Sequence, residues 1–79
     1  MDENLARSII EIAIFLEYCS EDLLDPDAAI EATEQLAAPL QKTSDDTKKE
    51  LISAFQELAP EYNERANFVL DLVGNFGIE

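Results

Sequence analysis

The fold is indicated first by residues 3–19, which read ENLARSIIEIAIFLEYC. Apolar side chains recur in this stretch at steps of four, three, four and three residues, which is the spacing of one face of an α-helix. This face carries Leu5, Ile9, Ile12, Leu16 and Cys19. The stretch therefore predicts an amphipathic helix that packs this face into the protein core.

A second apolar stripe lies on the opposite side of the same predicted helix. It consists of Ile10, Ile14 and Tyr18, which follow each other at intervals of four residues, with charged side chains on either side. Apolar side chains bordered by charge are typical of the centre of a protein–protein interface. Three interpretations are open: the stripe binds a partner, it forms the seam of a homodimer, or the helix is central and covered on both sides.

Residues 25–27, Asp-Pro-Asp, predict the start of a second helix. Asp25 can accept hydrogen bonds from the free N–H groups of the first turn, and Pro26 suits the first helical position. Pro39 is expected to end or kink this helix because proline lacks the N–H that the helical bond pattern needs. The expected inner face comprises Ala29, Ile30, Thr33, Leu36, Ala37 and Leu40.

Two further helical patterns follow. Residues 43–46, Thr-Ser-Asp-Asp, predict a loop and a cap before a third helix. Pro60 then either starts a fourth helix after a tight turn or kinks one long helix, and the apolar spacing that restarts in residues 62–76 favours a fourth helix. The sequence thus predicts an all-α fold, a small four-helix bundle with short connections and antiparallel neighbours, as one domain over residues 1–79.

The charge balance of the chain is strongly acidic. Eighteen Asp and Glu residues stand against five Lys and Arg, with no histidine, for a net charge of −13. Self-repulsion of this size opposes folding, so we expect the acidity to have a use. A nucleic-acid ligand is excluded because such binding depends on basic side chains that replace counterions, and an anionic membrane surface is disfavoured for the same reason.

Acidic side chains are concentrated around the predicted second helix, and residues 8–41 contain no basic residue at all. We interpret this region as a docking surface for a basic protein, in which the acids speed association and the Ile10, Ile14 and Tyr18 stripe anchors the partner. The alternative is a solvated acidic face that keeps the protein soluble. The acidic members of the predicted binding set are Glu17, Glu21, Asp22, Asp25, Asp27, Glu31 and Glu34.

Catalytic chemistry finds little support in the sequence. Without histidine, the commonest general base and the usual zinc ligand are both absent. Asp22, Asp25 and Asp27 lack the glycine and the spacing of a calcium-binding loop. No glycine-rich phosphate loop or nucleophile elbow occurs. We therefore expect no enzyme activity, no catalytic residue, no cofactor and no metal site.

The sequence also favours a cytoplasmic location. The chain opens on Met1-Asp2-Glu3, where a secretory signal would have a basic start, and its most apolar stretch, residues 9–16, is too short to cross a bilayer. The single cysteine, Cys19, fits a reducing compartment and a buried position.

Two known families share the size and acidity of this chain. Acyl carrier proteins attach phosphopantetheine to a serine in an Asp-Ser-Leu motif, but the matching place here, residues 24–27, reads Leu-Asp-Pro-Asp. In size, charge and expected helix count the whole chain resembles the nuclease-colicin immunity proteins, which are small, acidic, cytoplasmic four-helix bundles of bacteria. Their paired-tyrosine-proline signature is missing, and Pro60-Glu61-Tyr62 matches it only in part, so no binding residue carries over.

The resemblance implies a mechanism in which an acidic helical face covers the basic cleft of a toxin or effector. We therefore predict a non-enzymatic immunity or inhibitor protein with a basic protein partner. The alternatives are a self-associating structural or regulatory module, in which the homodimer would use the stripe, and a nucleic-acid mimic that occupies the site of a DNA-binding protein or nuclease.

Overall fold

The computed structural model covers residues 1–79 and consists of helices and short connections, without a β-strand. The all-α prediction is therefore confirmed. The elements in chain order are α1 (Glu3–Tyr18), α2 (Pro26–Gln41), α3 (Asp45–Leu58), the 3₁₀ helix η1 (Ala59–Arg65) and α4 (Ala66–Phe76).

Short polar side chains set the start of the first three helices, as expected for residues whose oxygens satisfy free backbone N–H groups. The Asp25 carboxylate accepts from the backbone N–H of Asp27 at 2.9 Å, and Pro26 occupies the first turn of α2. The Ser44 hydroxyl accepts from the backbone N–H of Thr47 at 3.1 Å. Both predicted helix starts are confirmed.

The number of helices differs from the prediction. α3, η1 and α4 form one continuous helical run that bends at Asn63, whose φ of 53° and ψ of −114° are non-helical. Counting this bent run as one element gives three helices and not four. Pro60 lies in the first turn of η1, where a missing N–H costs little, so the helical run continues past it. The bend that changes the direction of the chain falls three residues later, at Asn63. Asparagine tolerates positive φ better than most residues.

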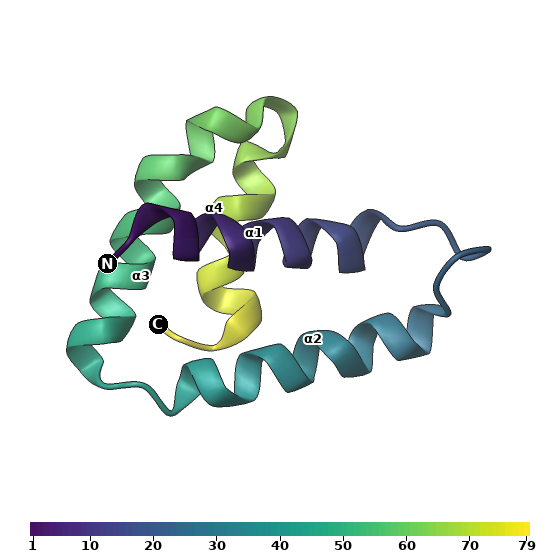
Figure 1. Ribbon diagram of the computed structural model, residues 1–79, viewed down its shortest axis with the longest axis horizontal. Helices are drawn as coiled ribbons and strands as arrows, with labels where there is room; N and C mark the ends of the chain where they lie inside the picture. Colours follow the sequence, from purple (N-terminus) through teal and green to yellow (C-terminus); the bar gives the residue numbers. More distant parts are fainter.

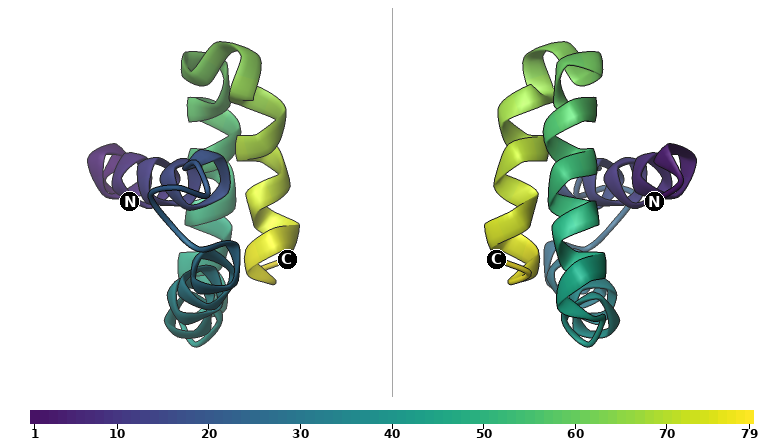
Figure 2. Two further views of the ribbon diagram at one scale, coloured as in Figure 1. Left: turned by 90° about the vertical axis from the view of Figure 1, so that its right-hand side faces the viewer. Right: turned by 90° about the vertical axis from the view of Figure 1, so that its left-hand side faces the viewer.

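The helices form two antiparallel pairs that cross each other steeply, so the molecule is not a bundle with aligned axes. α1 and α2 run in opposite directions, as do α3 and α4; α1 passes in front of the second pair, and α2 crosses below its lower end in the view of Figure 1 (Figures 1 and 2). The connection between α2 and α3 turns a corner. Here the Thr43 hydroxyl donates to the Leu40 carbonyl at 2.7 Å and satisfies the end of α2.

One hydrophobic cluster lies where the two pairs cross, and no polar side chain is buried in it. Phe55 from α3 and Phe76 from α4 are completely buried, with ring centroids 6.4 Å apart. From α2, Ala37 is buried, and the Gln41 amide donates to the Phe76 carbonyl at 2.7 Å. The second pair thus provides most of the core, and α1 and α2 are laid across it.

The orientation of α1 is the main correction to the sequence analysis. Ile10 is completely buried, whereas Leu5 and Ile12, which were expected to face inward, are 55% and 50% exposed. The apolar arc of α1 covers more than half of its circumference, so spacing alone leaves its rotation open. Ala6 and Ala13 flank Ile10 on the buried side, and such small residues let α1 approach its neighbours closely.

The far end of the α1–α2 hairpin projects beyond α3 and α4 (Figure 1). We call residues 16–34 the hairpin tip. No residue between Ala13 and Ala37 is buried. Cys19, expected to be buried, is half-buried here. The hairpin tip thus consists of two helix ends joined by a turn and lacks a core of its own.

Candidate protein-binding surface

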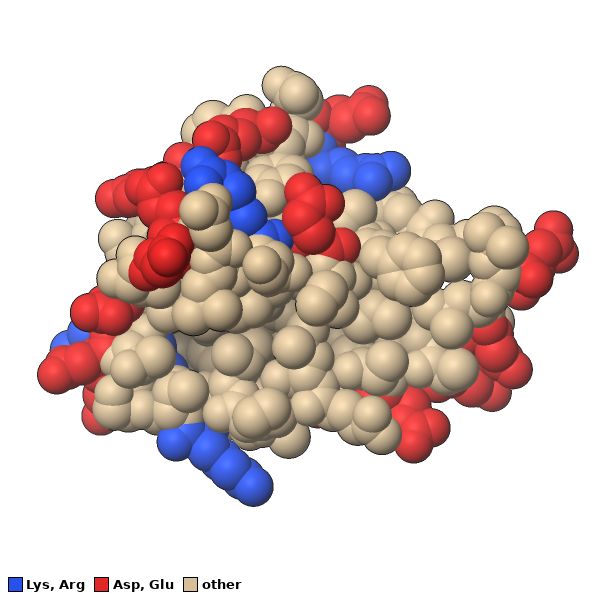
Figure 3. Space-filling model, in the orientation of Figure 1, with Lys and Arg blue, Asp and Glu red and all other residues tan.

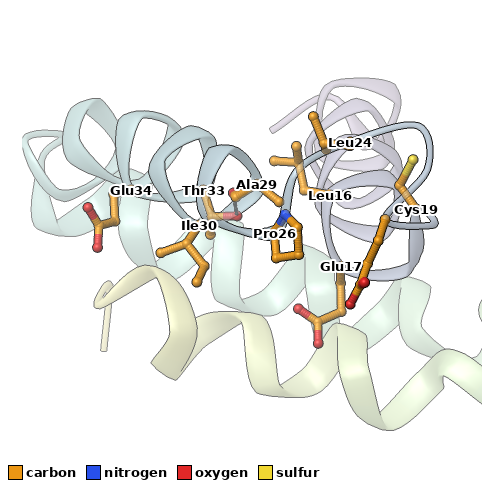
Figure 4. A pocket seen from close by; sticks show the side chains of 10 residues that line it. Leu16, Glu17, Cys19, Leu24, Pro26, Ala29, Ile30, Thr33 and Glu34 are labelled. Atoms are coloured by element: carbon orange, nitrogen blue, oxygen red, sulfur yellow. Dashed lines mark hydrogen bonds between the residues drawn. The ribbon is translucent and has the colours of Figure 1, made fainter.

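A pocket of about 400 Å³ lies between the end of α1 and the start of α2. Its apolar wall includes Leu16, Leu24 and Ile30, with α2 side chains on one side and α1 side chains on the other (Figure 4). Glu17 and Glu34, two of the predicted binding residues, line the same pocket. A third predicted acid that lines it is Glu21.

The other predicted acids lie in the hairpin tip outside this pocket, and all of them are exposed. Asp25 is occupied as the cap of α2, and Asp27 lies in the first turn. The Glu31 carboxylate accepts a hydrogen bond from the Gln35 amide at 3.4 Å. Asp22 lies in the turn between the two helices. The structure thus brings all seven acids to one end of the molecule but gathers only three around a hollow.

No ion pair neutralises the acids of the hairpin tip. The three ion pairs of the molecule join Arg7 to Glu3 and to Glu61, and the amino terminus to Glu50. Arg65 lies 4.1 Å above the ring of Tyr18 and forms no ion pair. Residues 16–34 contain no basic residue, and Arg65 above Tyr18 is a cation beside them that forms no ion pair, so the acids of the hairpin tip stay unpaired. Figure 3 shows acidic and no basic side chains on the visible surface of this end.

The predicted apolar anchors do not form an exposed surface. Ile10 is completely buried and Ile14 packs against the core, so the expectation that this side of α1 is open is wrong for both. Tyr18 is half exposed, but its ring packs edge-to-face on Phe68 with centroids 5.4 Å apart, beneath Arg65. This side of α1 is covered by the rest of the protein. Of the three interpretations, it agrees with a helix that is covered on this side, although the opposite side of α1 is open.

The open apolar side of α1 is instead formed by Leu5, Ile12 and Phe15, which we call the α1 stripe. They are 55%, 50% and 58% exposed. Ser8 lies between them at helical spacing, so the four side chains follow one line along the helix. Figure 3 shows a largely uncharged surface across the middle of this face, with acidic side chains at its borders. The helical spacing of these residues was visible in the sequence, but two of them had been assigned to the core.

A second hollow, of about 540 Å³, lies where α1 meets η1 and is lined by Glu11, Ile14 and residues 61–65. Burial raises the pKa of the Tyr62 hydroxyl, and the neighbouring carboxylates of Glu11 and Glu61 raise it further. The hydrogen bond from Arg7 to Glu61 raises the pKa of the Arg7 guanidinium. The hydrogen bonds between Arg7 and Glu61 hold α1 against η1, and the charged groups at this junction are therefore engaged within the molecule.

No group of three or more acidic or cysteine side chains is arranged to hold a metal ion. None of the helices combines the length and the apolar character that crossing a membrane requires. Comparisons with protein-family models, with curated proteins and with solved structures find no match to this chain. The candidate surface is therefore argued from its geometry and charge alone.

Proposed function

We propose that this protein is a non-enzymatic binding protein that covers a basic surface of another protein with its α1–α2 hairpin. The observation that supports this proposal is the position of the α1 stripe next to the uncompensated acids of the hairpin tip. Apolar side chains that stay exposed beside unpaired charges of one sign suit a partner that offers both apolar contact and positive charge.

The two parts of the surface would act at different stages of binding. The negative field of the hairpin tip attracts a basic partner over a distance of about a Debye length, roughly 8–10 Å at physiological salt, and so raises the association rate. The α1 stripe then loses its water. Full burial of a Leu, Ile or Phe side chain contributes about 1.5–3 kcal/mol, and half of each is still exposed, so each contributes roughly 1 kcal/mol.

Within this class we favour an immunity or inhibitor protein of the bacterial cytoplasm that neutralises a toxin or effector by occluding its basic substrate site. The reasons are the small size, the net charge of −13 and the all-α class, which the chain shares with the nuclease-colicin immunity proteins, although its helices are not arranged as an aligned four-helix bundle. A nucleic-acid-mimic inhibitor would use the same physics on a DNA-binding protein or nuclease.

A purely catalytic role fits these residues less well. The chain has no histidine, and the acids in the pocket of the hairpin tip stand beside apolar side chains without a nucleophile–base pair. A half-buried thiol, Cys19, lines the same pocket.

The proposal is tested by capturing the partner from lysate of the source cells at low salt and measuring its stoichiometry and affinity with purified components. We expect one-to-one binding to a basic protein whose toxic or nuclease activity is lost in the complex. The variant Asp27→Asn/Glu31→Gln/Glu34→Gln should bind at least about tenfold more weakly at low salt, with a smaller difference at high salt.

A matched variant on the other helix pair is Asp46→Asn/Glu57→Gln/Glu64→Gln. It changes the net charge by the same three units, and Asp46 lies in the first turn of α3 as Asp27 does in α2. If the two triple variants weaken binding equally, net charge and not the hairpin tip attracts the partner. Wild-type affinity in the first variant would refute the role of the hairpin tip.

A further inference from the structure

The α1 stripe has a shape that narrows the kind of partner segment it accepts. We propose, building on the binding function above, that its occupant is an amphipathic α-helix of the partner with basic residues gathered at the end that lies over the hairpin tip. On this molecule the α1 stripe runs straight along α1 and ends next to the acids of the hairpin tip.

The line of apolar side chains matches a helix. From Leu5 to Phe15 the stripe spans ten residues, or roughly 15 Å along the axis of α1. A partner helix lying alongside presents apolar side chains at steps of three and four residues over the same length. An extended segment would need a free strand edge to pair its backbone, and this protein contains no strand.

The charge distribution along α1 gives the partner helix a direction. At the start of α1, Arg7 already pairs with Glu3 and Glu61, so this end needs no positive charge from a partner. At the other end, α1 leads into the hairpin tip, where Glu21, Asp22 and Asp25 are exposed and form no ion pair. A helix with its basic residues at one end therefore fits in one orientation better than in the reverse.

A second copy of this chain is a poorer occupant. Each copy carries a net charge of −13, and residues 8–41 offer no base to meet the acids of another copy. Two of the five basic residues, Arg7 and Arg65, are engaged in contacts within the molecule. Packing two stripes together would bring two strongly negative molecules into contact, which opposes association. Charge complementarity selects a basic partner.

The test uses model peptides of leucine and lysine, about fourteen residues or four helical turns long. The first has leucines at helical spacing and its lysines at one end; a second has the same composition in scrambled order. Binding is measured by fluorescence anisotropy, and a nitroxide label at the lysine-rich end locates that end by broadening of amide signals. We expect the first peptide to bind at least about tenfold more tightly and to broaden residues 16–34.

Variants of the protein complete the test. Ile12→Gln/Phe15→Gln changes two side chains that are at least half exposed, so the fold is kept, and should weaken binding of the amphipathic peptide about tenfold. Leu70→Gln on α4, also exposed, is the matched control and should leave binding unchanged. Circular dichroism checks that all three proteins remain helical.

Equal affinity for the two peptides, absence of binding, or broadening in α3 and α4 would overturn the inference. A wild-type dimer at micromolar concentration, detected by sedimentation and abolished in Ile12→Gln/Phe15→Gln, would overturn it as well. Failure of this inference can be told apart from failure of the proposed function. The proposed function is tested separately, by the salt-dependent binding of a whole basic protein to the wild type and the triple variants.

Discussion

The α3–α4 pair has a packed interior, whereas the hairpin tip, made of the end of α1, a turn and the first half of α2, has none. In the α3–α4 pair, Phe55, Val69 and Phe76 are completely buried, whereas no residue of the hairpin tip is buried at all. The helical parts of the hairpin tip continue α1 and α2 beyond the core, and the Asp25 cap fixes the start of α2. Regions with few buried contacts open at low free-energy cost. The comparison suggests a division of labour in which one pair supplies stability and the other supplies an adaptable surface.

The largest expected effect separates two neighbouring isoleucines of α1. Ile10 is completely buried and Ile12 is half exposed. Ile10→Ala should lower the free energy of unfolding by about 2–5 kcal/mol because it leaves a cavity among side chains that cannot fully collapse. Ile12→Ala should cost roughly 0.5 kcal/mol or less, as at other exposed sites. Urea denaturation followed by circular dichroism measures both.

The same pair of variants tests the rotation of α1 directly. If Ile12→Ala were the more destabilising change, α1 would pack with the side expected from the sequence, and the α1 stripe would be part of the core. A loss of partner affinity in Ile12→Ala without loss of stability would strengthen the distinction between the two sides of the helix.

A smaller effect concerns the junction of α1 and η1 at high pH. The pKa of Tyr62 is raised, by burial first and then by Glu11 and Glu61, while Arg7 opposes the shift. In the unfolded chain tyrosine ionises near its ordinary pKa of about 10, so the unfolded state loses its proton first as the pH rises. The stability that Tyr62 contributes is therefore fully present below that pH and is lost as the pH rises through the folded-state pKa.

Comparing the wild type with Tyr62→Phe isolates this contribution, since the other tyrosine and the lysines titrate in both proteins. We expect the wild type to lose stability relative to the variant above about pH 10, measured by urea denaturation at a series of pH values. A stability difference that stays constant through this range would contradict the assigned environment of Tyr62.

Local signals in the sequence predicted the helical class and the starts of α2 and α3. Asp25 and Ser44 accept hydrogen bonds from backbone N–H groups two or three positions away, and Pro26 fits the first turn, where its missing N–H costs little, so their effect is readable from neighbours alone. α4 ends at Phe76, and Gly77 after it adopts a φ of 67°, a conformation that glycine adopts without strain.

What could not be predicted depends on contacts between distant parts of the chain. The rotation of α1 is decided by packing against α3 and α4, and the broad apolar arc of α1 fits more than one rotation. The chain bends at Asn63, three residues after Pro60, and beyond this bend α4 packs back onto α3. The acids of the predicted binding set lie in the hairpin tip and stay a prediction as binding residues, whereas two of the predicted apolar anchors, Ile10 and Ile14, are turned toward the core.

The most direct test of the central claim is hydrogen–deuterium exchange of the protein alone and in complex with its captured partner. In the free protein, amides of the hairpin tip should exchange faster than those of α3 and α4, because only the latter are held by buried side chains. Binding should slow exchange in the hairpin tip and along α1, and leave α3 and α4 unchanged. Protection that appears on α3 and α4 while the hairpin tip stays unaffected would contradict the assignment of the α1–α2 hairpin as the binding surface.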